Sequence, residues 1–172
     1  RASTLDDEAT FGIQSSQKVG PTVADDIKTS AIWSILFALI AIALYILIRF
    51  RNISFSIGAV VGLVHDVLFI LGIYSIFYSI MPFSLEIDQS FIAAILTVIG
   101  YSINDTVVVF DRIRENIGLY PKRALNQLIN MSVNSTLSRT FSTSFSTALP
   151  LLAMFIFGGE TIRGFVFAIL LG

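Results

Sequence analysis

Ionisable side chains occur inside stretches of this sequence that otherwise hold apolar and small polar residues. Asp105 follows an apolar run that begins at Phe91, and Arg139 lies in a later run that extends to Phe157. A carboxylate at the centre of a membrane helix costs roughly 2.5–3.5 kcal/mol on insertion scales, so such a group usually has a partner and a function. The chemistry open to this pair is proton uptake and release by the carboxyl group, beside a cation that favours its ionised form.

Asp105 and Arg139 are expected at similar depths in the membrane. Asp105 lies six residues before Asp111, or about 9 Å from that end of its helix, and Arg139 is expected about 7 Å in from the same side. On antiparallel neighbouring helices the two groups can pair. Either they form a structural pair that offsets the cost of burial, or Asp105 titrates and a change in its distance to Arg139 alters its affinity for the proton.

Polar neighbours of these two groups could hold water along a proton path. They are Tyr101, Ser102 and Asn104 before Asp105, and Thr143 after Arg139. The same side chains could equally hydrogen-bond one helix to another. Asn104 is expected to position Asp105 or its waters rather than to react.

A second acid, Asp66, lies 13 residues along another apolar segment, near mid-membrane at about 20 Å. It is either a second relay site or a structural hydrogen-bond acceptor. His65 precedes it, and a histidine titrates near neutral pH when unperturbed, although a lone histidine is more often a packing residue. Adjacent residues point about 100° apart on a helix, so these two need not touch.

The composition identifies an integral membrane protein. Hydrophobic residues make up 55% of the chain and charged residues 13%, about half the charge of a soluble domain. A net charge of -1 without basic–aromatic patterning argues against nucleic acid as a partner. One histidine and no cysteine argue against a metal site, and no nucleotide or catalytic motif is present. We therefore expect no enzyme and no cofactor, and any work must draw on an ion gradient or on a partner's ATP.

The apolar segments predict an all-α, polytopic membrane bundle. Five membrane helices are expected at about residues 29–49, 53–81, 89–110, 134–157 and 161–172, the last truncated because it is too short to cross. An amphipathic stretch predicts a short cytoplasmic surface helix at about 122–131. Residues 1–21 are interpreted as the end of an extracytoplasmic domain and a linker, and residues 22–172 as the bundle.

Basic residues predict the orientation of this bundle. Lys and Arg gather at the turns on one side, at positions 49, 51, 112, 114, 122 and 123, whereas the turns at 82–89 and 158–160 have none. The positive-inside rule places the basic turns in the cytoplasm and residues 1–30 on the extracytoplasmic side.

The sequence GYSINDTVVVFDRIREN, residues 100–116, resembles the signature of the SecF proteins of the SecD/SecF protein-export family. The resemblance extends, in chain order, to Val19-Gly20-Pro21, Arg49-Phe50-Arg51, His65-Asp66-Val67, Leu137-Ser138-Arg139-Thr140 and Gly158-Gly159. Together these segments cover almost all of residues 19–172. By position, the family's essential membrane acid falls on Asp105 and its essential arginine on Arg139.

The resemblance implies one half of a bundle of the RND superfamily, with six spans and a large extracytoplasmic domain after the first. The five segments here would be spans two to six. It also implies a pseudosymmetric SecD half, separate or fused, the SecYEG channel and the ATPase SecA as partners in a bacterial inner membrane. The proton-motive force would promote preprotein translocation. The alternatives are a proton-coupled RND-type exporter of small molecules or lipids, and a purely structural scaffold.

Overall fold

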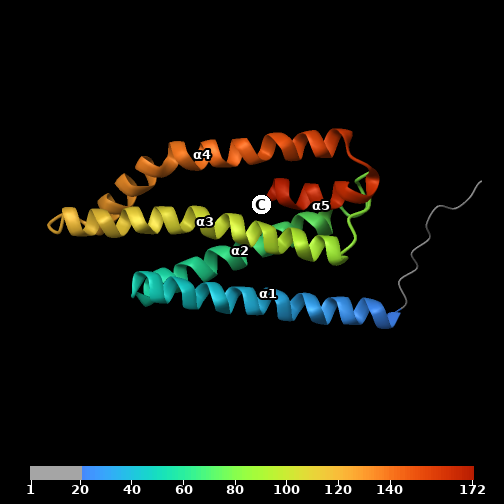
Figure 1. The fold of residues 1–172 in the computed structure, drawn as a ribbon, viewed down its shortest axis with the longest axis horizontal. Coiled ribbons are helices and arrows are strands. Elements are labelled where there is room, and N and C mark those ends of the chain that lie inside the picture. The colour runs from blue at the N-terminus through green and yellow to red at the C-terminus, as the bar shows by residue number, and fades with distance from the viewer. Residues whose placement is uncertain (1–20) are drawn as a thin grey trace, which may run out of the picture.

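The structure is a computed structural model that describes residues 21–172 (Figure 1). In this range the chain forms helices and no strand, so the predicted all-α bundle is confirmed. The helices are α1 (Pro21–Phe50), α2 (Ile53–Phe77), α3 (Gln89–Leu119), α4 (Leu125–Phe157) and α5 (Glu160–Leu171). The predicted end of an extracytoplasmic domain lies almost wholly in residues 1–20, outside the described residues.

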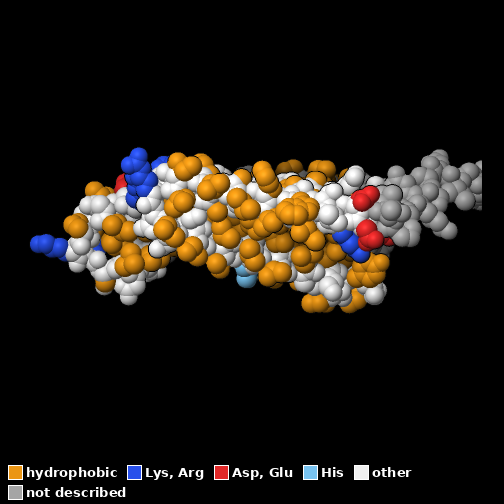
Figure 2. All heavy atoms as spheres, turned by 90° about the horizontal axis from the view of Figure 1, so that it is seen from below, with side chains coloured by type: hydrophobic (Ala, Val, Ile, Leu, Met, Phe, Trp, Pro, Cys, Tyr) orange, Lys and Arg blue, Asp and Glu red, His pale blue; other side chains and the backbone are white. Residues whose placement is uncertain are grey.

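Four of the five helices are long and apolar enough to cross a membrane. The exception is α5, whose 12 residues span about 18 Å of a hydrocarbon core that is about 30 Å thick. The outer faces carry the apolar surface that lipid requires: Phe37 is 78% exposed and Leu68 62%. Figure 2 shows hydrophobic side chains covering the middle of the long axis, with most of the basic side chains seen in this view at one end. The chain is therefore a multi-pass membrane protein.

The helix α3 is the centre of the bundle, because it packs against each of the other four helices. The α1–α2 and α3–α4 turns lie toward one end of the molecule, and the α2–α3 and α4–α5 connections lie at the other (Figure 1). At the first end, Arg49 Nη2 lies 3.1 Å from Asp111 Oδ1 and ties α1 to α3.

Polar caps start two of the helices. Arg51 adopts a left-handed backbone conformation with φ of 50°, which reverses the chain after α1. The Asn52 side chain then accepts a hydrogen bond from the backbone N–H of Ser54 at 2.9 Å and begins α2. Asp88 does the same for α3, accepting from Phe91 N–H at 2.8 Å. The capping residues Asn52 and Asp88, which lie in turns between apolar segments, thus determine where α2 and α3 begin.

The main core lies where α2, α3 and α5 meet. Its buried side chains include Leu63, Ile70, Ile95, Val98 and Ala168. In lipid such contacts are stabilised by close packing and by hydrogen bonds rather than by exclusion of water. One such bond joins α2 to α5, because the Tyr74 hydroxyl donates to the carbonyl oxygen of Gly164.

Gly164 allows α5 to approach the α2–α3 connection. A Cβ atom at this position would lie 2.8 Å from the carbonyl oxygen of Ser84. We expect Gly164→Ala to destabilise the fold by about 1–2 kcal/mol, because the clash is with backbone. The matched control is Gly72→Ala, since a Cβ there meets no described atom within 4 Å. Thermal unfolding in detergent tests this, and equal melting temperatures for the two variants would contradict it.

The predicted surface helix at 122–131 is wrong. After a turn at 120–124, α4 begins at Leu125 and continues without a break to Phe157. Of its apolar side chains, Leu128 is only 3% exposed, whereas Leu125 and Ile129 are 58% and 39% exposed. The helix α3 likewise extends beyond the predicted limit of 110, to Leu119. The ends of α3 and α4 on either side of their turn thus form one antiparallel hairpin.

A proline interrupts the backbone bonding of α4. Pro150 lies inside the helix and has no N–H, so the carbonyl oxygen of Ser146 lacks its usual partner four residues on. The neighbouring residues Ala148 and Leu151 line the cavity described below.

Candidate functional site

A buried polar contact aligns α3 with α4. Asn116 Nδ2 donates to Ser132 Oγ at 2.7 Å, and Ser132 Oγ donates to the carbonyl oxygen of Leu128 at 2.7 Å. Asn116 is 3% exposed and Ser132 is fully buried. Because both ends of the hydrogen bond are shielded, it defines which residues face one another along the hairpin.

This alignment separates Asp105 from Arg139. Counting back from Asn116 and forward from Ser132 places Asp105 opposite Thr143 and leaves Arg139 about one turn, or roughly 6 Å, nearer the α3–α4 turn. No ion pair among the described residues includes either group. The helix ends at Leu119 and Leu125 would by themselves leave the two groups level, and it is the contact between Asn116 and Ser132 that sets them apart. The side chain of Arg139 is exposed, so the expected direct pair is absent from this conformation.

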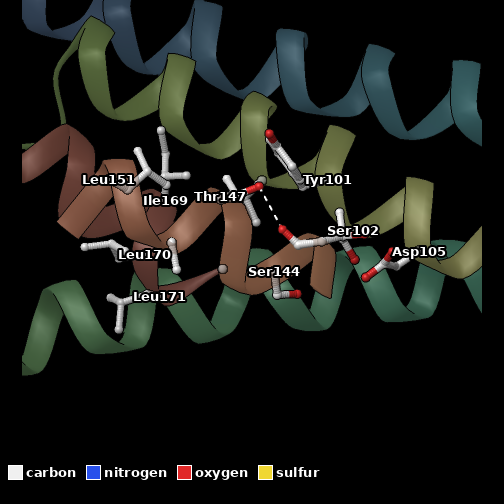
Figure 3. A pocket seen from close by; sticks show the side chains of 13 residues that line it. Tyr101, Ser102, Asp105, Ser144, Thr147, Leu151, Ile169, Leu170 and Leu171 are labelled. Atoms are coloured by element: carbon white, nitrogen blue, oxygen red, sulfur yellow. Dashed lines mark hydrogen bonds between the residues drawn. The ribbon is translucent and has the colours of Figure 1, made fainter. Parts of the chain in front are cut away.

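Asp105 lines a cavity of about 270 Å³ between α3, α4 and α5 (Figure 3). Apolar side chains from the end of α5, such as Leu170 and Leu171, close one side of it. Its polar side chains come from α3 and α4: Tyr101, Ser102, Asp105, Thr143, Ser144 and Thr147. At about 30 Å³ per molecule of liquid, a cavity of this size has room for several waters.

The walls of this cavity present hydrogen-bond acceptors. Thr143 Oγ1 donates to the carbonyl oxygen of Arg139 at 2.9 Å, and Thr147 Oγ1 donates to that of Thr143 at 3.0 Å. Both hydroxyl hydrogens are therefore directed along α4, and the oxygens remain free to accept. Asp105 Oδ1 is buried and has no hydrogen-bond partner among the described residues. Such a set of acceptors suits water or a proton rather than an anion.

Asp66 belongs to the same region, on α2. Ser102 Oγ donates to Asp66 Oδ2 at 2.6 Å, and His65 Nδ1 lies 3.3 Å from Asp66 Oδ1. The prediction left open whether His65 and Asp66 touch, and in the structure they do. Ser102 is one helical turn from Asp105, so the second acid is linked to the cavity through a single hydroxyl.

Asn104 is not part of this cavity. It is exposed and lines a separate groove between α1 and α3, together with Tyr45 and Gly100. Because adjacent helical residues point about 100° apart, Asp105 and Asn104 face different neighbours. The expectation that Asn104 positions Asp105 is therefore not supported by the geometry.

Sequence reasoning missed three polar residues. Ser144 and Thr147 line the cavity, although the predicted polar face of α4 followed Arg139 and Thr143. Their spacing from Thr143 at one and four residues was the available signal. Arg163, in α5, was not considered; its Nε is buried without a hydrogen-bond partner among the described residues.

Fold and site together define a class: a multi-pass helical membrane protein in which one carboxyl oxygen, without a hydrogen-bond partner in residues 21–172, lies at a partly polar cavity between the helices. Residues 2–172 match the family described as protein export membrane protein SecD/SecF, C-terminal. The chain belongs to this family.

Individual relatives agree with this assignment. The chain is 56% identical over 154 residues to the protein translocase subunit SecF of Rhodothermus marinus, covering 90% of this chain and 50% of the relative. It is 48% identical over 160 residues to SecF of Rhodobacter capsulatus, covering 93% of this chain and 46% of the relative. The chain thus spans about half the length of these relatives.

A solved structure shows the same arrangement of helices. A crystal structure of SecDF in a super-membrane-facing form matches with a TM-score of 0.72 at 39% identity. The match covers 88% of this chain and 19% of the SecDF chain. The helices described here therefore correspond to a limited part of that larger protein.

Proposed function

We propose that this chain is part of an accessory subunit of the Sec translocase that uses the proton-motive force to promote preprotein translocation. The observation that carries the proposal is the buried Asp105 Oδ1, without a hydrogen-bond partner, at a polar cavity within a membrane bundle. The names of the relatives, translocase subunits, support the transport class.

In the proposed cycle, Asp105 takes up and releases a proton, and Arg139 is the cation that favours its release. The two groups are about one turn apart along the hairpin, so a shift of α4 by one turn toward Asp105 would bring Arg139 level with it. An approaching cation favours the carboxylate and drives the proton out. Each proton that moves down a 100 mV potential releases about 2.3 kcal/mol, which is available to drive that movement.

The proposal extends to partners and location. The similarity to SecDF supports a SecD half, in the same chain or a separate one, as the neighbour of this bundle. SecYEG and the preprotein moved by SecA would be the other partners, in the cytoplasmic membrane of a bacterium. The gathering of Lys and Arg at the α1–α2 and α3–α4 turns supports a cytoplasmic position for that end. No hydrolytic step is proposed, because the energy comes from the gradient.

The test uses inverted membrane vesicles that contain the protein and the other translocase subunits, energised by an imposed proton gradient. We expect the gradient to increase the amount of preprotein translocated after the ATP-driven step, and a protonophore to remove the increase. Vesicles depleted of the protein should show no gradient-dependent increase. An equal response to the gradient with and without the protein would contradict the proposal.

A second measurement distinguishes preprotein translocation from proton-coupled export of small molecules or lipids. Cells depleted of the protein are tested for sensitivity to small toxic compounds and for accumulation of unexported precursors. Precursor accumulation supports translocation. Increased drug sensitivity without any export defect would replace the proposal with proton-coupled export of small molecules or lipids.

A further inference from the structure

The hydroxyl group of Ser102 connects α3 to the second membrane acid. Ser102 Oγ donates to Asp66 Oδ2 at 2.6 Å, across 36 residues of sequence. The other carboxyl oxygen, Asp66 Oδ1, is 3.3 Å from His65 Nδ1. The side chain of Asp66 is 31% exposed and that of His65 76%. Asp66 therefore lies between an outward-facing imidazole and an inward-facing hydroxyl.

The same hydroxyl is a neighbour of Asp105. Residues three apart on a helix share a face, and both Ser102 and Asp105 line the cavity. In Figure 3 the two side chains lie on neighbouring turns of α3, beside the cavity. Asp105 Oδ1 has no hydrogen-bond partner among the described residues, and the Ser102 hydroxyl is bonded to Asp66 instead. One serine thus stands between carboxyl groups carried by two different helices.

We propose that Ser102 relays protons between Asp66 and Asp105, which makes Asp66 the second carboxyl group of the coupling site. The inference rests on the proposed function, in which Asp105 is the coupling acid. Protonated Asp66 gives its proton to Ser102 Oγ, while the hydrogen of the Ser102 hydroxyl passes to the Asp105 carboxylate. Asp66 is then a carboxylate, Asp105 is a neutral acid, and Ser102 is again an uncharged hydroxyl.

The recorded hydrogen bond is the geometry expected after such a transfer. With Asp66 ionised, the hydroxyl hydrogen of Ser102 points back to Asp66 Oδ2, as the structure has it. Rotation about the Cα–Cβ bond of Ser102 moves the hydroxyl between the two acids. Serine has the least hindered such rotation of the residues that carry an aliphatic hydroxyl, because threonine adds a methyl group at Cβ.

A purely structural hydrogen bond between α2 and α3 would have the same geometry. Substitutions at Asp66 and Ser102 separate the two explanations. Asp66→Asn keeps an oxygen that accepts from Ser102 but cannot carry a proton. Ser102→Thr keeps the hydroxyl, whereas Ser102→Ala removes it. A structural role tolerates Asp66→Asn, and a relay does not.

The experiment measures gradient-dependent preprotein translocation, and proton flux, in the same vesicles. Asp66→Asn and Ser102→Ala should each lower the flux at least about tenfold, within the range typical of a lost proton-transfer group, and Ser102→Thr should restore most of it. The matched control is Thr97→Val, because Thr97 Oγ1 donates only to the carbonyl oxygen of Ala93, at 2.8 Å within α3. It should match the wild type.

Each remaining outcome overturns the relay. Wild-type flux in Asp66→Asn would leave a structural bond only, and wild-type flux in Ser102→Ala would show that the hydroxyl is not on the path. Losses that follow only the amount or thermal stability of the protein in the membrane would show a folding role. Asp105→Asn distinguishes failure of the relay from failure of the proposed function. If Asp105→Asn abolishes coupling while Asp66→Asn does not, the relay fails and the proposed function stands. If Asp105→Asn is fully active, the proposed function itself fails.

Discussion

Asp105→Asn is expected to abolish the gradient-dependent part of preprotein translocation and to lower proton flux by roughly 10²-fold or more. The amide has nearly the same shape as the carboxyl group and can still contact water in the cavity, but it cannot take up and release a proton. Translocation driven by ATP alone should continue. The measurement is the translocated fraction with and without an imposed gradient.

The matched control for this change is Asp111→Asn, the same substitution six residues on in the same helix. Asp111 pairs with Arg49 at 3.1 Å, but the two side chains are 55% and 43% exposed. An exposed pair of this kind contributes about 0–1 kcal/mol, so coupling should persist. Equal losses in Asp105→Asn and Asp111→Asn would point to a general effect of charge on α3 and would contradict a specific role for Asp105.

Arg139→Ala is expected to reduce gradient-dependent translocation at least about tenfold, because it removes the cation that favours release of the proton. Arg139→Lys should retain part of the activity, since it keeps the charge but not the planar guanidinium. Both variants are measured in vesicles with an imposed gradient. Accumulation in the membrane is followed in parallel.

A second arginine near the same end of α4 provides the control. Arg123 lies over the ring of Tyr120, with its guanidinium carbon 4.7 Å from the ring centroid, and contacts neither the cavity nor Asp105. Arg123→Ala should leave coupling unchanged. Full activity of Arg139→Ala at normal protein levels would remove Arg139 from the proposed cycle.

The membrane helices were predictable because long apolar segments have few folding options in lipid, where backbone groups must be bonded within the segment. The bundle, the turns at Asn52 and Asp88 and the grouping of basic residues followed from that constraint. The constraint does not determine where each helix ends outside the apolar region. Periodicity predicted a helix around Leu125 but not its continuity with the membrane segment, and it does not reveal the buried contact between Asn116 and Ser132 that joins the two helix extensions.

The sequence predicted which residues belong to the site, but it did not predict the contacts between them. An acid inside an apolar run identified Asp105, and its neighbours Ser102 and Thr143 do line the same cavity. The pairing with Arg139 required that residue to lie opposite Asp105, whereas the Asn116–Ser132 contact places Thr143, four residues further on, in that position. The link from Asp66 to Ser102 joins two helices, so it depends on how α2 rotates against α3, and composition carries no information about that rotation.

Pro150 gives α4 a point at which it can hinge. The missing backbone bond at Ser146 leaves the segments on either side less firmly joined, and it lies level with the cavity. If the α4 segment that carries Arg139 moves toward Asp105, the segment after Pro150 would therefore change its tilt. It would not simply slide along the helix axis. The helix would bend at Pro150 and so change the angle of whatever lies beyond the α4–α5 turn.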